Sequence, residues 1–249
     1  LHVLLSSEDA NQLARFTGFV KSNIAFKINR LIGRFGTFWE RRYRSIPVTF
    51  EEAAQTDRLR YLLAHGVKER LVQKASDWPG VSSLPWLLDG KEVVGVWHSR
   101  TAEYYGTRSA KGRAASVSSD FETTLPIEMS PLPCWAHLPD CDWRAFVAEM
   151  VTEIEAEVAA AAKAADPPMP VMGVAAVLSQ DPLGPSRQCN RSPAPTVHAA
   201  SKSERQLWQE RLRDLRVAHA EASEQFRAGH RDVDFPHGTF RPLGGFVAW

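Results

Sequence analysis

The sequence predicts an α+β protein with long helices, few strands and a mostly helical C-terminal part. Apolar residues recur at three- and four-residue spacing in four segments, as they do on the buried face of a helix. These predicted helices cover residues 6–31, 49–66, 142–165 and 200–228. Strand-like patterns occur at residues 1–5, which form a continuous apolar run, and at residues 38–44, where aromatic and basic side chains alternate.

The bulk composition is that of a globular protein rather than a disordered chain. The chain has 249 residues, of which 44% are hydrophobic and 24% charged, which is enough for one large domain or two small ones. The net charge of +1 conceals an asymmetry, because residues 1–74 carry a charge of +6 and the remainder carries −5. A basic N-terminal part suits a polyanion such as nucleic acid, although a solvated helix face also uses lysine and arginine.

The cysteines and the apolar segments indicate the cellular compartment that we expect for this protein. Cys134, Cys141 and Cys189 are odd in number and dispersed, unlike a disulfide framework or a zinc site. They fit a reducing cytosol, so we expect a cytoplasmic protein. No apolar run approaches membrane-spanning length and no secretory signal is visible, so no membrane partner is expected.

The chain opens with the predicted strand at residues 1–5. Its sequence is Leu-His-Val-Leu-Leu, a run suited to a buried strand. Because the chain begins with leucine rather than methionine, we expect a fragment that lacks earlier strands.

The first helix is predicted to follow directly. A serine within residues 6–10 can cap its free N–H groups, and the helix continues to about Leu31 before Gly33 ends it. On its polar face, Lys21 and Arg30 are candidate contacts for DNA phosphates; the alternative is that each is a solvated surface charge.

Residues 38–44 interleave rings with guanidinium groups. This pattern suits single-stranded nucleic acid, because rings stack on bases while arginines hold phosphates. The alternative is a strand in which Trp39 and Tyr43 are buried while Arg42 and Arg44 face solvent; both can hold at once. The candidate DNA-binding side chains of this segment are Trp39, Arg41, Arg42 and Arg44.

The second helix contains the candidate catalytic residue, Tyr61. Thr49 is expected to cap this helix and Gly66 to end it. Tyr61 and His65 are four residues apart and therefore lie on the same side of the helix. A phenol can act as a nucleophile beside an imidazole that binds a metal, although a surface tyrosine beside a solvated histidine is the simpler interpretation.

The middle of the chain is less regular. Residues 76–90 are rich in turn-forming residues and include a short helix around residues 86–88. Trp97, Tyr104 and Tyr105 are predicted to share a second helical stretch. Tyr104 and Tyr105 are rival nucleophiles, but neither has a histidine one turn away.

The C-terminal part is predicted to be helical. The helix at residues 142–165 places Phe146, Met150, Ile154 and Val158 on its core face. Residues 171–178 form a short helix or strand, and Gly229 ends the long helix at residues 200–228. The apolar tail at residues 235–249 is expected to fold back.

These patterns predict three parts. They are an N-terminal domain at residues 1–105, which contains Tyr61, a linker or irregular loop at residues 106–140, and a helical C-terminal extension at residues 141–249.

Three blocks in order along the chain resemble one family, the REP-associated tyrosine transposases of the single-tyrosine HUH superfamily. Residues 36–48 are similar to its Gly-x-x-Trp-Glu-x-Arg-[Phe/Tyr]-x-Ser segment, and residues 60–72 to its nucleophile helix. Residues 77–83, Asp-Trp-Pro-Gly-Val-Ser-Ser, are similar to a third family element. The resemblance covers roughly the first 90 residues, and three ordered blocks make it specific.

The resemblance implies an HUH or ferredoxin-like catalytic domain, an antiparallel sheet flanked by helices, here incomplete at its N-terminus. It implies Tyr61 as nucleophile and a divalent metal, Mg or Mn, with His2 at the second position of the family's His-hydrophobic-His strand. The first histidine would lie before Leu1. His65 stands where the family has glutamine or asparagine, so it is either a metal ligand or a polar helix end.

The expected function is that of a transposase that nicks and joins single-stranded or hairpin DNA through a 5′-phosphotyrosine. The missing first histidine favours an alternative, a catalytically inactive protein that binds DNA hairpins. A third possibility is a structural helical protein whose C-terminal half mediates assembly. The expected partner is DNA, and we expect a monomer or a homodimer located in the cytoplasm near the nucleoid.

Overall fold

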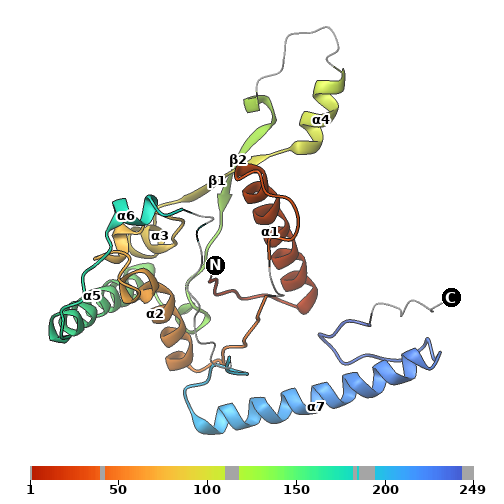
Figure 1. Ribbon diagram of the computed structural model, residues 1–249. Helices are drawn as coiled ribbons and strands as arrows, with labels where there is room; N and C mark the ends of the chain where they lie inside the picture. The colour runs from red at the N-terminus through yellow and green to blue at the C-terminus, as the bar shows by residue number, and fades with distance from the viewer. Residues whose placement is uncertain (1, 40–42, 110–117, 182–183, 185–193, 243–249) are drawn as a thin grey trace. The chain divides into compact units, whose positions relative to one another are not determined.

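The computed structural model describes residues 2–39, 43–109, 118–181, 184 and 194–242. The chain divides into two compact units, unit 1 (residues 1–58 and 189–249) and unit 2 (residues 59–188), each described by itself below. The helices are α1 (Ala10–Leu31), α2 (Glu52–Lys68), α3 (Leu84–Asp89), α4 (Arg100–Ser109), α5 (Asp140–Ala164), α6 (Val174–Leu178) and α7 (Lys202–Arg227). The strands are β1 (Val93–His98) and β2 (Glu122–Ile127) (Figure 1).

The predicted α+β class is confirmed, with helices dominant and one small antiparallel sheet among the described residues. β1 pairs with β2 in a register that runs from Val93 opposite Ile127 to His98 opposite Glu122. An HUH-type sheet stays a prediction, and so do the three predicted domain boundaries.

In unit 1, α1 forms at the predicted position but is capped by Asp9 rather than by a serine. The Asp9 carboxylate accepts a hydrogen bond from the backbone N–H of Gln12 at 2.7 Å. At the other end, Gly33 takes a positive φ of 62°, which a glycine adopts at no steric cost.

The predicted strand at residues 1–5 does not form within the described residues 2–5, and Val3 and Leu5 are exposed. An apolar run becomes a strand only where a neighbouring strand pairs with its backbone N–H and C=O groups. In the described chain, no strand pairs with this run. The described residues of the segment 38–44 also form no strand.

Two distant segments of unit 1 meet side by side in what we call the junction, residues 47–51 with residues 197–201. The backbone N–H of Thr49 donates to His198 O at 2.9 Å, and His198 N–H donates to Pro47 O at 2.9 Å. These bonds make a parallel bridge between Val48 and His198. Thr49 is 1% exposed, so the junction has a buried centre.

The Glu51 carboxylate links the two segments of the junction through hydrogen bonds. One carboxylate oxygen accepts from the N–H of Ala200 at 2.9 Å and from the hydroxyl of Thr49 at 2.8 Å. The other accepts from the N–H of Ser201 at 3.0 Å. Ser201 in turn caps α7 by accepting from the N–H of Glu204. A single carboxylate at the start of α2 thus organises the start of α7.

The segment that follows α7 in unit 1 folds back onto this helix. α7 ends at Arg227, and Gly229 follows with a φ of 104°, as predicted. The chain then turns back, because the Phe235 ring lies 5.9 Å from Phe226, and His219 Nε2 lies 3.1 Å from Phe240 O. The predicted return of the tail is confirmed for these described residues, while residues 243–249 lie outside the description.

Unit 2 has the better buried core. Trp143 of α5 stacks near Trp86 of α3, with ring centroids 5.5 Å apart. Arg60 of α2 forms ion pairs with two carboxylates of α5, Glu153 at 2.8 Å and Glu157 at 2.7 Å. The buried side chains of this unit include Leu59, Val67, Val72, Leu84, Leu87, Leu132, Trp135, Trp143, Val147 and Ile154.

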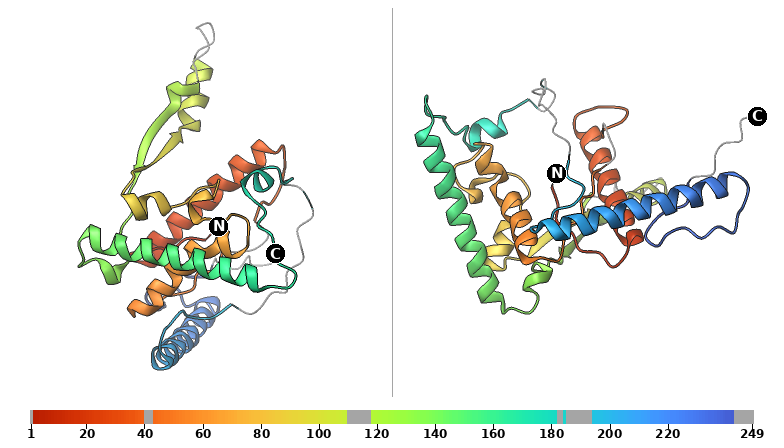
Figure 2. Two further views of the ribbon diagram at one scale, coloured as in Figure 1. Left: turned by 90° about the vertical axis from the view of Figure 1, so that its left-hand side faces the viewer. Right: turned by 90° about the horizontal axis from the view of Figure 1, so that it is seen from below.

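The β1–β2 ribbon extends away from these helices and carries α4 beyond its end (Figure 1; left view of Figure 2). Trp97 lies in β1, so its predicted helical position is wrong, whereas Tyr104 and Tyr105 lie in α4 as predicted. β2 lies within residues 106–140, which were expected to be irregular. Its short Thr-rich sequence forms a strand because β1 pairs with it.

α2 runs past Gly66 to Lys68, so the predicted end at Gly66 is wrong. The left-handed residue is instead Arg70, with a φ of 58°. Gly66 serves close packing, because a Cβ there would lie only 3.3 Å from atoms of Trp78 and Val72.

α5 is confirmed, and of its predicted core face Ile154 is buried while Phe146 is not. Trp143, Val147 and Ile154 are buried, whereas Phe146 is 45% exposed. Both faces of this helix carry apolar residues, so the position of the neighbouring α3 decides which face is covered.

Glu51→Gln should destabilise the protein in a pH-dependent way. Hydrogen bonding to Ser201 lowers the pKa of the Glu51 carboxyl below 4.5 and outweighs the opposing effect of burial. Its contribution is therefore present above pH 4.5 and is lost as the pH falls through the lowered native pKa. We expect the variant to melt a few degrees lower than wild type at neutral pH. This difference in melting temperature should disappear in acid, and circular dichroism measures it.

The matched control is Glu52→Gln, which removes a carboxylate from the same helix end and leaves the bonds of Glu51 intact. A gap between wild type and Glu51→Gln that did not change with pH would contradict this account.

His198 should make the free energy of unfolding depend on pH in a second, separate range. Burial lowers the pKa of its imidazole below 6.5, and the nearby charge of Arg58 lowers it further. The unfolded chain therefore takes up a proton first, and stability declines as the pH falls from 6.5 toward the lowered native pKa. We expect His198→Gln to lose this part of the pH dependence of the free energy of unfolding, measured by urea denaturation. An unchanged slope would disprove the assignment.

Candidate nucleic-acid interface

A groove of about 730 Å³ lies on α1 in unit 1. Small side chains recur along one helix face at three- and four-residue spacing, which keeps the floor of the groove low. At Gly18 nothing lies within 4 Å of where a Cβ would be, so the floor is open there. The lining residues are Ala14, Thr17, Gly18, Lys21, Ser22 and Ala25 from α1, with Trp39, Tyr43 and Ser45 from the following segment.

One basic and two aromatic side chains converge in this groove, and we call Lys21, Trp39 and Tyr43 the α1 cluster. The Lys21 ammonium lies 5.2 Å from the Trp39 ring centroid and 5.4 Å from that of Tyr43. The Trp39 indole donates to the backbone O of Lys21 at 3.0 Å, and Phe38 packs edge-on against it at 4.9 Å. Trp39 is therefore held in place, while Tyr43 is 47% exposed.

A cation between two rings suits a ligand that combines negative charge with flat apolar surfaces. The ammonium attracts phosphate, and the ring faces accept stacked bases. The rings also attract the ammonium through their electron-rich faces, which keeps Lys21 at the groove rather than in free solution.

Two other predicted DNA-binding residues, Arg44 and Arg30, do not line the groove. Arg44 is exposed next to Tyr43. Arg30 lies in the last turn of α1 and does not line the groove. Arg41 and Arg42 lie outside the described residues. The sequence pattern predicted Lys21 and Trp39 but missed the small-residue face, which the spacing of Ala14, Gly18, Ser22 and Ala25 would have indicated.

Tyr61 lies in unit 2 on the outer face of α2 and is 39% exposed. The His65 ring, one turn further, has its centroid 6.0 Å from that of Tyr61 at an interplanar angle of 49°. The Lys68 ammonium also lies 6.0 Å from the Tyr61 ring centroid. The phenol thus has an imidazole and an ammonium as neighbours along one helix face.

The predicted metal ligands do not make a complete site in the described chain. His2 is exposed and belongs to unit 1, whereas His65 belongs to unit 2. No three His, Cys, Asp or Glu side chains of the described residues gather in a way that could hold a metal ion. His2 and His65 stay predicted ligands.

No described helix combines the length and the apolar character needed to cross a membrane. No model of a known protein family, no curated protein and no solved structure matches the chain.

Proposed function

We propose that the chain binds single-stranded or hairpin DNA through the groove on α1. The observation that carries this proposal is the α1 cluster, in which one ammonium lies within 5.4 Å of two ring centroids. In this proposal a phosphate takes up the charge of Lys21, and bases stack on Trp39 and Tyr43. Affinity then comes from neutralised phosphates and from stacking, neither of which requires a particular base sequence.

Two further features support DNA as the partner. Residues 1–74 carry the excess positive charge of the chain, and α1 and the cluster lie within them. The small side chains of the groove floor also let a sugar-phosphate backbone come close to the helix.

Trp39→Ala should weaken binding to single-stranded DNA about five- to 150-fold, because stacking of one base on an aromatic ring contributes about 1–3 kcal/mol. The measurement is fluorescence anisotropy with a labelled hairpin that carries a single-stranded flank. Trp97→Ala is the matched control, because this tryptophan is 36% exposed and lies on β1 in unit 2. Equal losses in the two variants would refute the role of the α1 cluster.

Lys21→Gln should reduce the salt dependence of binding. One phosphate contact fewer lowers the slope of log K against log salt by about 0.7 on a single strand. Lys27→Gln serves as control, because Lys27 is exposed and does not line the groove. If both variants changed the slope equally, the effect would be one of net charge rather than of the groove.

A second candidate function, DNA strand cleavage by Tyr61, is favoured by the exposed phenol and by the resemblance of its helix. In this proposal the Tyr61 oxygen attacks the phosphorus of a phosphodiester and gives up its proton, and a P–O bond to the 5′-ward nucleotide breaks. The leaving 3′-oxygen takes up a proton, and the strand stays attached as a 5′-phosphotyrosine. Because the unperturbed pKa of a phenol is about 10, a nearby base or cation must assist. His65 and Lys68 are the candidates on the same helix face, each 6.0 Å from the Tyr61 ring centroid, measured from the His65 ring centroid and from the Lys68 ammonium.

Tyr61→Phe should abolish a covalent protein–DNA adduct while leaving DNA binding unchanged. The adduct is detected on a denaturing gel after incubation of labelled hairpin DNA with Mg or Mn ions. Tyr105→Phe is the control, because Tyr105 is a 64% exposed tyrosine on α4. An adduct formed by Tyr61→Phe would disprove the assignment. Binding without any adduct in wild type would leave DNA binding as the function.

A further inference from the structure

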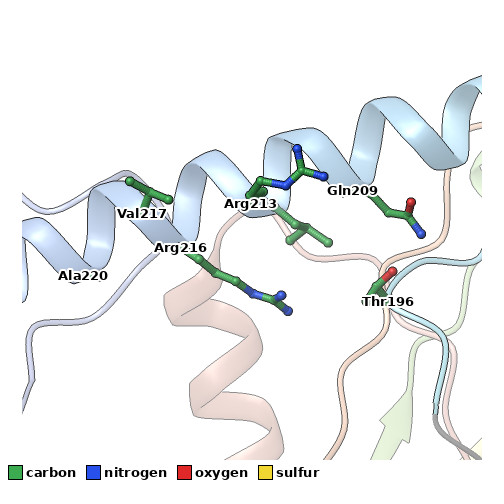
Figure 3. A pocket seen from close by; sticks show the side chains of 7 residues that line it. Thr196, Gln209, Arg213, Arg216, Val217 and Ala220 are labelled. Carbon is green, nitrogen blue, oxygen red and sulfur yellow. The ribbon is translucent and has the colours of Figure 1, made fainter.

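α7 carries a second groove in unit 1, separate from the one on α1. It has a volume of about 440 Å³ and lies along one side of the helix, next to the segment that contains Thr196 (Figure 3). Arg213 and Arg216 supply its charged groups, and Gln209 and Thr196 supply neutral polar ones. Figure 3 shows the side chains of Gln209 and Arg216 extending from α7 toward Thr196.

The charge of this groove is not neutralised within the described chain. No ion pair joins Arg213 or Arg216 to a carboxylate of the described residues. By contrast, Arg60 of unit 2 is held by two glutamates. Arg213 and Arg216 are three residues apart in α7, and both line the groove, so two positive charges border the space that an anion would occupy.

The remaining lining residues restrict the kind of anion. Leu212 and Val217 offer an apolar surface that a free inorganic ion does not need. The Gln209 amide and the Thr196 hydroxyl can each donate and accept a hydrogen bond, so they suit a ligand that has both kinds of group. A fatty acid lacks such groups along its chain. A nucleotide unit has all three features, with a phosphate for the arginines, a flat face for the apolar surface and a base edge for the amide and hydroxyl.

We propose that the α7 groove is a second subsite for a phosphate and base of the same DNA strand that binds the groove on α1. This inference rests on the proposed function, since it takes the ligand to be single-stranded DNA. A strand long enough to reach both grooves gains affinity, because its second contact is made within an already formed complex.

The test is the double variant Arg213→Gln/Arg216→Gln in the full chain, with labelled single-stranded DNA as the probe. We expect binding to weaken about tenfold and the slope of log K against log salt to fall by about 0.7, because one phosphate contact contributes about 0.7 on a single strand. Lys202→Gln/Arg211→Gln removes the same charge from α7 outside the groove and should change neither quantity as much. Circular dichroism checks that α7 still folds in both variants.

The outcomes separate this inference from the proposed function. If Trp39→Ala weakens binding but the arginine variant binds like wild type, the α7 subsite is wrong and the α1 groove stands. If wild type binds no single-stranded DNA, both are wrong. If an acidic peptide binds wild type and loses affinity in the arginine variant while DNA does not, the groove takes a peptide and the nucleotide assignment is overturned.

Discussion

The carboxylate of Glu51 is the constraint on which the organisation of unit 1 depends. It accepts hydrogen bonds from the backbone of Ala200 and Ser201, about 150 residues further along the chain, just before α7 begins. Free N–H groups at a helix start need acceptors, and a charged acceptor binds them more strongly than a neutral one. The same carboxylate stands at the start of α2. Two helices of distant sequence therefore begin at one place, and the groove of α1 and the groove of α7 belong to one unit.

The two units differ in how they satisfy their positive charges. In unit 2, Arg60 is bound by two glutamates, and the Arg144 guanidinium lies 4.2 Å from the Trp143 ring centroid while it donates to backbone oxygens of α3. In unit 1, Lys21 lies against two rings, and Arg213 and Arg216 form no ion pair with the described carboxylates. Lys21, Arg213 and Arg216 thus differ from Arg60, because no described carboxylate forms an ion pair with them. This difference supports nucleic acid as a partner of unit 1.

α2 presents Tyr61 because of what the rest of that helix buries. Leu59 is 6% exposed and Val67 is 2% exposed, and together they set which side of α2 packs against the core. The ion pairs of Arg60 with α5 fix the rotation of the helix further. Tyr61 is thereby left on the outer side, where a nucleophile must be if it is to meet a DNA strand. An exposed phenol is necessary for strand cleavage but is equally compatible with a protein that only binds DNA.

The sequence by itself determined the long helices α1, α5 and α7, because their apolar spacing and the residues at their ends act within a few positions of the chain. It named Lys21 on the polar face of the first helix and Trp39 in a basic and aromatic segment as separate candidates, whereas the fold brought these two residues, 18 positions apart, into contact. Tertiary structure alone decided the pairing of β1 with β2, the buried face of α5 and the packing of Gly66 against Trp78. A strand needs a partner for its backbone, and a helix with two apolar faces buries the one that a neighbour covers. These choices depend on residues far away in the sequence, so no local pattern contains them.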